Sequence, residues 1–204
     1  MVSSIDILAN QTKPKRRHRR KKQTVISLLI AIVATLGYQA GWFDSPQKAL
    51  QENQPGLYLV TRFDDGDTIE VNMNGSQEKI RFIGVDTPET HDPRKAVQCF
   101  GQAAAAFTKQ LIGNQAVRLE SDPLSSNRDR YNRLLRYVYL PTGKLANLEI
   151  IAQGYGFAYT GFPFTKSDEF TTAQTAAREG QRGLWKDCQP AKNQYGGFTS
   201  NDAP

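Results

Sequence analysis

The sequence predicts an α+β domain of about five short strands and three helices, preceded by one apolar helix near the N-terminus. Three observations lead to this fold class. Short segments rich in β-branched and aromatic residues occur before and after residue 100, alanine-rich or amphipathic segments lie between and after them, and one charge-free apolar run follows a basic leader. The chain has 204 residues, which is enough to bury a core.

Positive charge is concentrated at the N-terminus. Residues 1–43 contain eight Lys and Arg residues and one acidic residue, a net charge of +7, whereas the whole chain carries +6. The other 161 residues therefore sum to about −1. Any affinity of this larger part for nucleic acid must come from local geometry, because it has no overall positive field.

Residues 24–43 carry no charge and as a helix would span about 30 Å, the thickness of a bilayer's hydrocarbon core. We expect a transmembrane signal anchor, with the basic leader 1–23 in the cytoplasm and the rest of the chain in the periplasm or outside the cell. The alternative is a cleaved signal peptide and a secreted protein. Residues 44–55 are polar, contain two prolines and predict a tether.

The folded domain is expected over residues 56–188, followed by a flexible tail at 189–204. Asn74-Gly75 predicts a hairpin turn between the second and third strands. Strands are expected at 56–63, 68–73, 79–85, 116–121 and 134–140, and helices at 101–112, 145–154 and 166–185, the last with Ser167 as its N-cap. Five strands with a helix between the third and fourth suit a small closed barrel of the oligonucleotide-binding type.

The segment RFIGVDTPET, residues 81–90, places Arg81, Asp86 and Glu89 beside an apolar strand. Charges next to a core are costly unless they are paired or bind a metal, so a surface ion pair and a metal-assisted site are both open at this point. In one regular strand Arg81 and Asp86 would point to opposite faces. An irregularity at Gly84, together with the break imposed by Pro88, would bring the side chains to one site.

Two further segments carry matching chemistry. DDGDT supplies Asp65 and Asp67 on a turn, and DRYNR supplies Arg130, Tyr131 and Arg133 before a strand. Carboxylates suit a hard cation such as calcium, and guanidinium groups suit a phosphodiester, whose oxygens they bind in pairs.

Taken together, these motifs resemble those of the thermonucleases, the staphylococcal nuclease-like enzymes. The resemblance covers roughly residues 57–187 and runs in order through DGDT, RFIGVDTPET, FGQAAAAFTK, DRYNRLLRYVY and GLW. It implies a five-stranded barrel with three helices and calcium-dependent cleavage of DNA and RNA. The expected function is therefore that of a hydrolase acting on phosphodiester bonds outside the cytoplasm, most simply as a monomer.

The resemblance also implies roles for particular residues. Arg81 and Arg133 would grip the scissile phosphate, and Glu89 would act as general base or orient the attacking water. The implied calcium ligands are Asp67, Asp86 and the carbonyl of Thr87. Tyr131 would lie beside a nucleotide phosphate and Tyr159 would stack on a base, although the match there needs a gap and leaves Phe162 as another stacking platform.

One alternative function remains at the level of sequence. A membrane-tethered module that binds nucleic acid with little or no catalysis, for example to capture DNA, would be expected to lack some of Arg81, Glu89 and Arg133, yet all three are present.

Cys99 and Cys188 both fall in the part expected outside the cytoplasm, where a disulfide is favoured over two free thiols.

Overall fold

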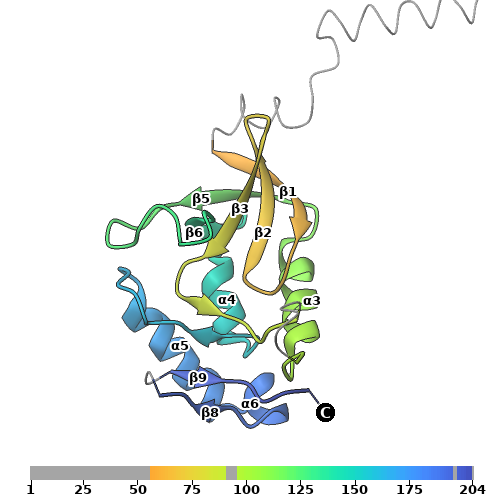
Figure 1. Ribbon diagram of the computed structural model, residues 1–204, viewed down its shortest axis with the longest axis vertical. Coiled ribbons are helices and arrows are strands. Elements are labelled where there is room, and N and C mark those ends of the chain that lie inside the picture. Colours follow the sequence, from red (N-terminus) through yellow and green to blue (C-terminus); the bar gives the residue numbers. More distant parts are fainter. Residues whose placement is uncertain (1–55, 91–95, 195–196, 204) are drawn as a thin grey trace, which may run out of the picture. The chain divides into compact units, whose positions relative to one another are not determined.

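The structure is a computed structural model that describes residues 56–90, 96–194 and 197–203 (Figure 1). Within these residues a closed barrel has the strand order β1-β2-β3-β6-β5, which confirms the predicted five-stranded barrel. Its strands are β1 Leu57–Phe63, β2 Thr68–Met73, β3 Ser76–Phe82, β5 Ala116–Glu120 and β6 Leu134–Tyr139. The expected apolar helix at 24–43 lies outside the described residues, and no helix in the described part is long and apolar enough to cross a membrane.

The hydrophobic pattern of the strands fills the barrel. Ile69 and Val71 of β2, together with Ile80, Val117 and Val138 from the other strands, are completely buried. The β2–β3 hairpin turns at Asn74 and Gly75, whose φ angles of 56° and 90° confirm the predicted turn. The parallel pairing of β3 with β6 then allows the sheet to close.

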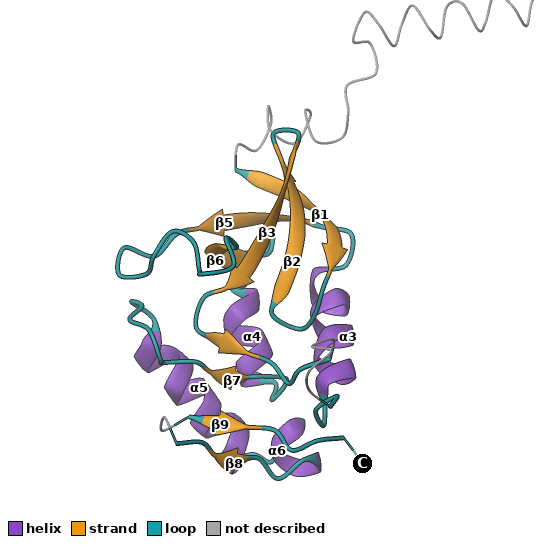
Figure 2. Ribbon diagram, viewed as in Figure 1, coloured by secondary structure: helices purple, strands orange, loops and turns teal. Residues whose placement is uncertain are grey.

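The helices pack beside and below the barrel in the view of Figure 2. The three predicted helices are α3 Gly101–Ile112, α4 Ala146–Ala152 and α5 Ser167–Glu179, and the predicted third helix ends early, so that a short α6 Leu184–Asp187 follows separately. Lys166, not Ser167, occupies the N-cap of α5, because Ser167 already has helical geometry as the first residue of the helix. Asp168 and Glu169 lie in the first turn, where they match the helix dipole.

The chain leaves the barrel at Gly84, at the end of β3. Gly84 has a φ of +70°, and a Cβ at this position would lie 2.6 Å from the Phe164 ring, so only glycine fits. A new strand, β4 Val85–Asp86, begins at once and pairs with β7 Phe157–Ala158. The expected irregularity is therefore a turn between two strands and not a bulge within one strand.

Asn147 of α4 fixes this departure point. Its side chain is fully buried, donates a hydrogen bond of 2.9 Å to the Ile83 carbonyl and accepts one of 2.9 Å from the Val138 backbone N–H. Because a buried amide satisfied on both sides allows little movement, Asn147 sets where β3 stops and where β4, which carries Asp86, begins.

A disulfide joins Cys99 to Cys188, with a Cα–Cα distance of 5.8 Å, as the sequence predicted. After it the chain forms a small hairpin, β8 Ala191–Lys192 with β9 Phe198–Thr199. The Phe198 ring packs edge-on against Trp185, at 4.9 Å between centroids. The described part of 189–204 therefore contacts the domain through the disulfide and the aromatic rings, and the flexibility of this tail stays a prediction.

Candidate active site

The Asp65–Asp67 turn joins β1 to β2 and is held from behind by α3. The buried Thr108 hydroxyl donates a hydrogen bond of 2.6 Å to the Gly66 carbonyl. A Cβ on Gly66 would lie 2.8 Å from the Thr87 side chain, so glycine allows this turn to approach the segment after β4. The turn and the Thr87 segment are therefore packed together as one unit.

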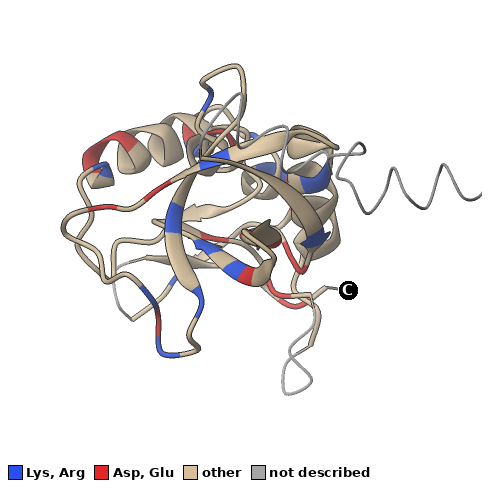
Figure 3. Cartoon of the chain, turned by 90° about the horizontal axis from the view of Figure 1, so that it is seen from above, with Lys and Arg blue, Asp and Glu red and all other residues tan. Residues whose placement is uncertain are grey.

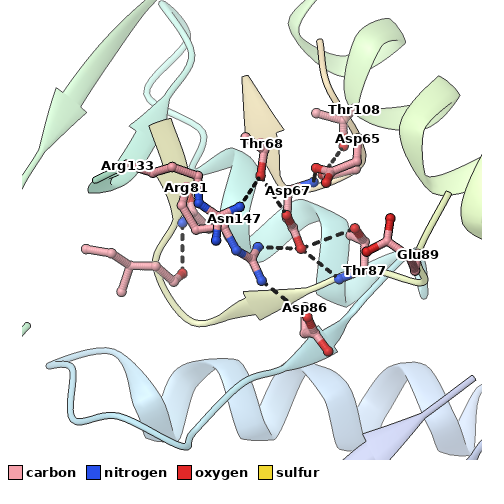
Figure 4. Close-up of polar contacts among 12 residues, drawn as sticks. Asp65, Asp67, Thr68, Arg81, Asp86, Thr87, Glu89, Thr108, Arg133 and Asn147 are labelled. Carbon is pink, nitrogen blue, oxygen red and sulfur yellow. Dashed lines mark hydrogen bonds and ion pairs between the residues drawn. The ribbon is translucent and has the colours of Figure 1, made fainter. Parts of the chain in front are cut away.

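Arg81, near the end of β3, lies at the centre of the polar cluster (Figure 4). Its guanidinium forms an ion pair with Asp67 and a second one, at 3.2 Å, with Oδ1 of Asp86. Burial lowers the pKa of Arg81, but the charges of Asp67, Asp86 and Asp65 outweigh burial and raise the pKa, so the guanidinium stays charged. Arg81 and Asp86, which a regular strand would separate, are thus brought together.

Asp67 accepts several hydrogen bonds besides its contact with Arg81. Its Oδ2 accepts the Thr87 backbone N–H at 2.9 Å and the Thr87 hydroxyl at 3.2 Å, and its Oδ1 accepts the Thr68 hydroxyl at 3.0 Å. Only 4% of Asp67 is exposed, so this carboxylate is held in one orientation by surrounding donors.

Three carboxylates, those of Asp65, Asp67 and Asp86, act on the guanidinium of Arg81. Burial, and then the charge of Asp67, raise the pKa of Asp65 to about 7, although Arg81 opposes this shift. The protonated form of Asp65 is therefore favoured first by burial and only then by the neighbouring charge of Asp67.

Arg133 reaches the cluster from the loop before β6. Oδ2 of Asp129 accepts Nε and Nη2 of Arg133, each at 2.7 Å, and its Oδ1 accepts the backbone N–H groups of Tyr131 and Arg133, each at 2.9 Å. Arg133 Nη1 also donates a 3.4 Å hydrogen bond to the hydroxyl of Thr68, which donates to Asp67. A continuous set of polar contacts therefore links Arg133 to the site of Arg81.

A cavity of about 740 Å³ opens beside this cluster and is lined by Arg81, Asp86 and Arg133 among others. Three exposed aromatic rings also line it: Tyr131 is 60% exposed, Tyr159 44% and Phe162 68%. Exposed aromatic rings beside guanidinium groups suit a ligand with both a flat ring and an anionic group. Basic and acidic residues are otherwise interspersed over the described elements (Figure 3).

Glu89 lies on the turn after β4, two residues beyond Thr87 (Figure 4). Its Oε1 accepts the Thr90 backbone N–H at 2.8 Å, and its own backbone N–H and carbonyl both contact Gln98. Glu89, Asp67 and Thr87 are not among the residues that line the cavity. Asp67 and Thr87 are linked to the cavity by polar contacts that run through Arg81, whereas Glu89 lies on the adjoining turn.

Several residues that build this site were missed at the level of sequence. Asp129 could have been found, because it stands four residues before Arg133 within DRYNR. Thr68, which directly follows the acidic turn in DDGDT, could also have been found from the sequence. Nothing in the sequence singles out Thr108, Asn147 or Gln98, whose partners lie far away along the chain.

The donor atoms of the cluster fit a hard cation. Among residues 56–90, 96–194 and 197–203, no group of three or more His, Cys, Asp and Glu side chains is arranged to hold a metal ion. The calcium ligands that the resemblance implied are the carboxylates of Asp67 and Asp86 and the backbone carbonyl of Thr87, and oxygen atoms of these kinds are the ones that calcium prefers.

A closed five-stranded barrel with helices packed against it defines the oligonucleotide-binding class of α+β domain. The family model of the staphylococcal nuclease homologues matches residues 79–187. The chain belongs to this family, which confirms the resemblance seen in its motifs.

Relatives agree with this assignment. The thermonuclease of Staphylococcus intermedius is 37% identical over 172 residues, 81% of this chain and 99% of the relative. The thermonuclease of Staphylococcus hyicus is 37% identical over 170 residues, 81% of this chain and 98% of the relative. Endonuclease YncB of Bacillus subtilis is 38% identical over 138 residues, 66% of this chain and 64% of the relative.

Proposed function

We propose that this protein is a calcium-dependent nuclease that hydrolyses phosphodiester bonds of DNA and RNA outside the cytoplasm. Its relatives are named thermonucleases and an endonuclease, which supports a hydrolase acting on phosphodiester bonds. The observation that carries the proposal is the cavity in which Arg81, Arg133 and Asp86 face the same space as three exposed aromatic rings.

The two arginines are the phosphate-binding groups. A guanidinium can bind two phosphoryl oxygens at once and keeps its charge at any working pH. Cleavage of a phosphodiester gathers negative charge on the phosphoryl oxygens, so fixed positive groups stabilise the transition state. Arg81 is fixed by Asp67 and Asp86, and Arg133 by Asp129, so little reorganisation is needed when charge develops.

Calcium would be held by Asp67, Asp86 and the Thr87 carbonyl. When bound, it would supply additional positive charge beside the phosphate. Asp67 is held in place by Thr68, Thr87 and Arg81, so a bound cation would share its carboxylate with these donors.

Glu89 is the proposed general base, or the group that orients the attacking water. Help of this kind accelerates a reaction by about 10²- to 10⁴-fold. The base contacts are assigned to Tyr159, with Phe162 as a second platform, and Tyr131 is assigned to the nucleotide phosphate. Because every base has a face on which a ring can stack, such contacts bind without strong sequence preference.

The test is nuclease activity of the full-length protein on DNA and on RNA, in saturating calcium and with a calcium chelator. We expect cleavage of both substrates with calcium, loss of cleavage with the chelator, and a loss of at least about 100-fold in Glu89→Gln. Arg133→Lys should also be impaired, since it keeps a charge but loses the paired geometry. Binding of DNA without any cleavage would instead identify a tethered nucleic-acid-binding module.

The proposed location follows from the charge-free segment 24–43 and the basic residues before it. We propose residues 1–23 as cytoplasmic leader, 24–43 as anchor, 44–55 as tether and 56–188 as nuclease domain. The full-length protein should then remain in the membrane fraction, and protease added to intact cells or spheroplasts should digest the domain. Complete protection would contradict this orientation, and a shortened soluble product would favour the cleaved signal.

A further inference from the structure

The backbone of Glu89 is held on both sides by one residue, Gln98. The Glu89 backbone N–H donates a hydrogen bond of 2.8 Å to Oε1 of Gln98, and the Glu89 carbonyl accepts one of 2.9 Å from the Gln98 backbone N–H. The polar groups on either side of the Glu89 Cα are therefore satisfied by the same residue, which limits rotation of this turn.

The start of α3 supports the turn from below. Gly101 is buried as the first residue of the helix, and its N–H donates to the Gln98 carbonyl at 3.0 Å. A Cβ on Gly101 would lie 2.8 Å from the Glu89 carbonyl oxygen and 3.1 Å from that of Pro88. The Glu89 turn is thus in direct contact with the helix that also holds the Asp65–Asp67 turn.

The C-terminal segment holds Gln98 in turn. Gln98 Nε2 donates to the Ser200 carbonyl at 3.4 Å. The next residue, Cys99, donates its N–H to the Asn201 carbonyl at 2.7 Å and accepts the hydroxyl of the buried Ser200 at 2.8 Å. Asn201 also donates a hydrogen bond of 3.2 Å to the carbonyl of Cys188, the residue that the disulfide joins to Cys99. The amide nitrogen of the Gln98 side chain is therefore held by the C-terminal segment, while its amide oxygen accepts the Glu89 N–H.

We propose that Gln98 is a positioning residue for the reaction and acts through Glu89. The proposal rests on the function proposed above, in which the Glu89 carboxylate serves the attacking water. If the Gln98 acceptor is removed, the half-buried N–H of Glu89 loses its partner and the turn must shift to find another. A shift of about 1 Å at a reacting group can lower a rate by about 100-fold.

The experiment is a double-mutant cycle in the full-length, oxidised protein, with kcat and KM measured on DNA in saturating calcium. Gln98→Met keeps the length of the side chain but has no acceptor, and we expect kcat to fall at least about tenfold with KM changed less than about twofold. Gln98→Glu keeps an oxygen acceptor and should retain most of the kcat that Gln98→Met loses. In a Glu89→Gln background, Gln98→Met should lower kcat by no more than about twofold further.

Gln77→Met is the matched control, because the Oε1 of Gln77, on β3, accepts a hydrogen bond from Thr61 of the barrel strand β1 and not from the site. It should leave kcat within about twofold of the wild type. Rates are compared per folded molecule, with the melting temperature measured for each variant.

Two results would overturn the proposal while Glu89→Gln remains impaired, and both would leave the proposed function standing. One is a wild-type kcat in Gln98→Met, and the other is an equal loss from Gln98→Met in both backgrounds. A wild-type kcat in Glu89→Gln would instead overturn both the proposed role of Glu89 and that of Gln98.

Discussion

At the scale of single residues, the site depends on a buried guanidinium shared between carboxylates. Asp67 is almost fully buried beside Arg81, whereas the Asp86 side chain is 48% exposed. Removing one partner of a buried ion pair typically costs about 3 to 5 kcal/mol, because it leaves a charge uncompensated. Substitution of Asp67 would therefore mix any loss at the proposed calcium site with loss of stability, and Asp86 is the better residue to substitute.

The first prediction concerns Asp86→Asn. The calcium concentration needed for half-maximal cleavage should rise at least about tenfold, because the proposed calcium site loses one charged ligand, and saturating calcium should partly restore the rate. Arg133→Lys should lose rate without recovery at high calcium. The increase in melting temperature on adding calcium gives a second readout and should be smaller in Asp86→Asn than in wild type. Identical calcium curves for wild type and Asp86→Asn would exclude Asp86 as a ligand.

The second prediction concerns Asp129, which orients Arg133. In Asp129→Asn one oxygen becomes an NH₂ group, which cannot accept the Nε and Nη2 hydrogen bonds of Arg133. We expect kcat/KM to fall about tenfold or more, as the guanidinium loses its fixed orientation. Asp187→Asn, an exposed change on α6, is the control and should have no such effect. Equal activities of the two variants would show that Asp129 has only a structural role.

At the scale of elements, α3 is the support on which two loops meet. Thr108 holds the Asp65–Asp67 turn, and Gly101 contacts the Glu89 turn about two helical turns earlier. Asp122, after β5, holds two segments that line the cavity. Its buried carboxylate accepts the Tyr137 hydroxyl at 2.7 Å, the Leu124 N–H at 2.8 Å, and both the N–H and the hydroxyl of Thr165. The segments that carry Leu124 and Phe162 into the cavity lining are thereby tied together.

The third prediction is a pH dependence of stability that comes from Asp122. Burial alone would raise its pKa, but the hydrogen bonds from Thr165, Tyr137 and Leu124 outweigh burial and lower the pKa to about 2. Because the pKa is lower in the folded state than in the unfolded state, the stabilisation is complete above about pH 4 and is lost as pH falls towards 2. It corresponds to roughly 2 kcal/mol.

Urea unfolding at several pH values measures this effect. The stability difference between wild type and Asp122→Asn should be largest at neutral pH and shrink between about pH 4 and pH 2. Asp187→Asn should show no comparable trend. A constant difference between wild type and Asp122→Asn across this range would mean that the ionised form of Asp122 is not the stabilising one.

At the scale of the whole molecule, the Cys99–Cys188 disulfide closes a loop of 89 residues around most of the domain. Chain entropy alone implies about 4 to 5 kcal/mol of stabilisation for a loop of this length. The bridge also connects the start of α3 to the C-terminal segment that contacts Gln98.

The fourth prediction is that a Cys99→Ala/Cys188→Ala protein is less stable by up to this amount. At a temperature where it is still folded, its kcat should be lower than that of the wild type, because the brace behind Gln98 is loosened. Reduction of the wild-type protein should reproduce both effects, and reduction of the variant should change nothing. A wild-type melting temperature after complete reduction would contradict the predicted stabilisation.

The sequence alone determined the barrel strands, the three main helices, the Asn74-Gly75 hairpin, the family and the disulfide pair. All but the disulfide follow from local signals, namely alternating apolar residues, helix formers, turn residues and motifs in a fixed order, and the disulfide was predicted because both cysteines fall in the part expected outside the cytoplasm. The candidate residues Asp67, Arg81, Asp86 and Arg133 were also recognisable, because charged groups beside apolar strands must be compensated and therefore stand out.

Only the tertiary structure decided how these residues meet. The sequence could not show that Gly84 ends β3 as a turn, that Asn147 holds this turn, or that the C-terminal segment forms hydrogen bonds with Cys99 and Gln98. Each of these contacts joins residues far apart along the chain, and the side chains involved, a buried amide or a single glutamine, carry no local pattern. Their partners are set by the packing of helices on the barrel, and that packing depends on the whole fold.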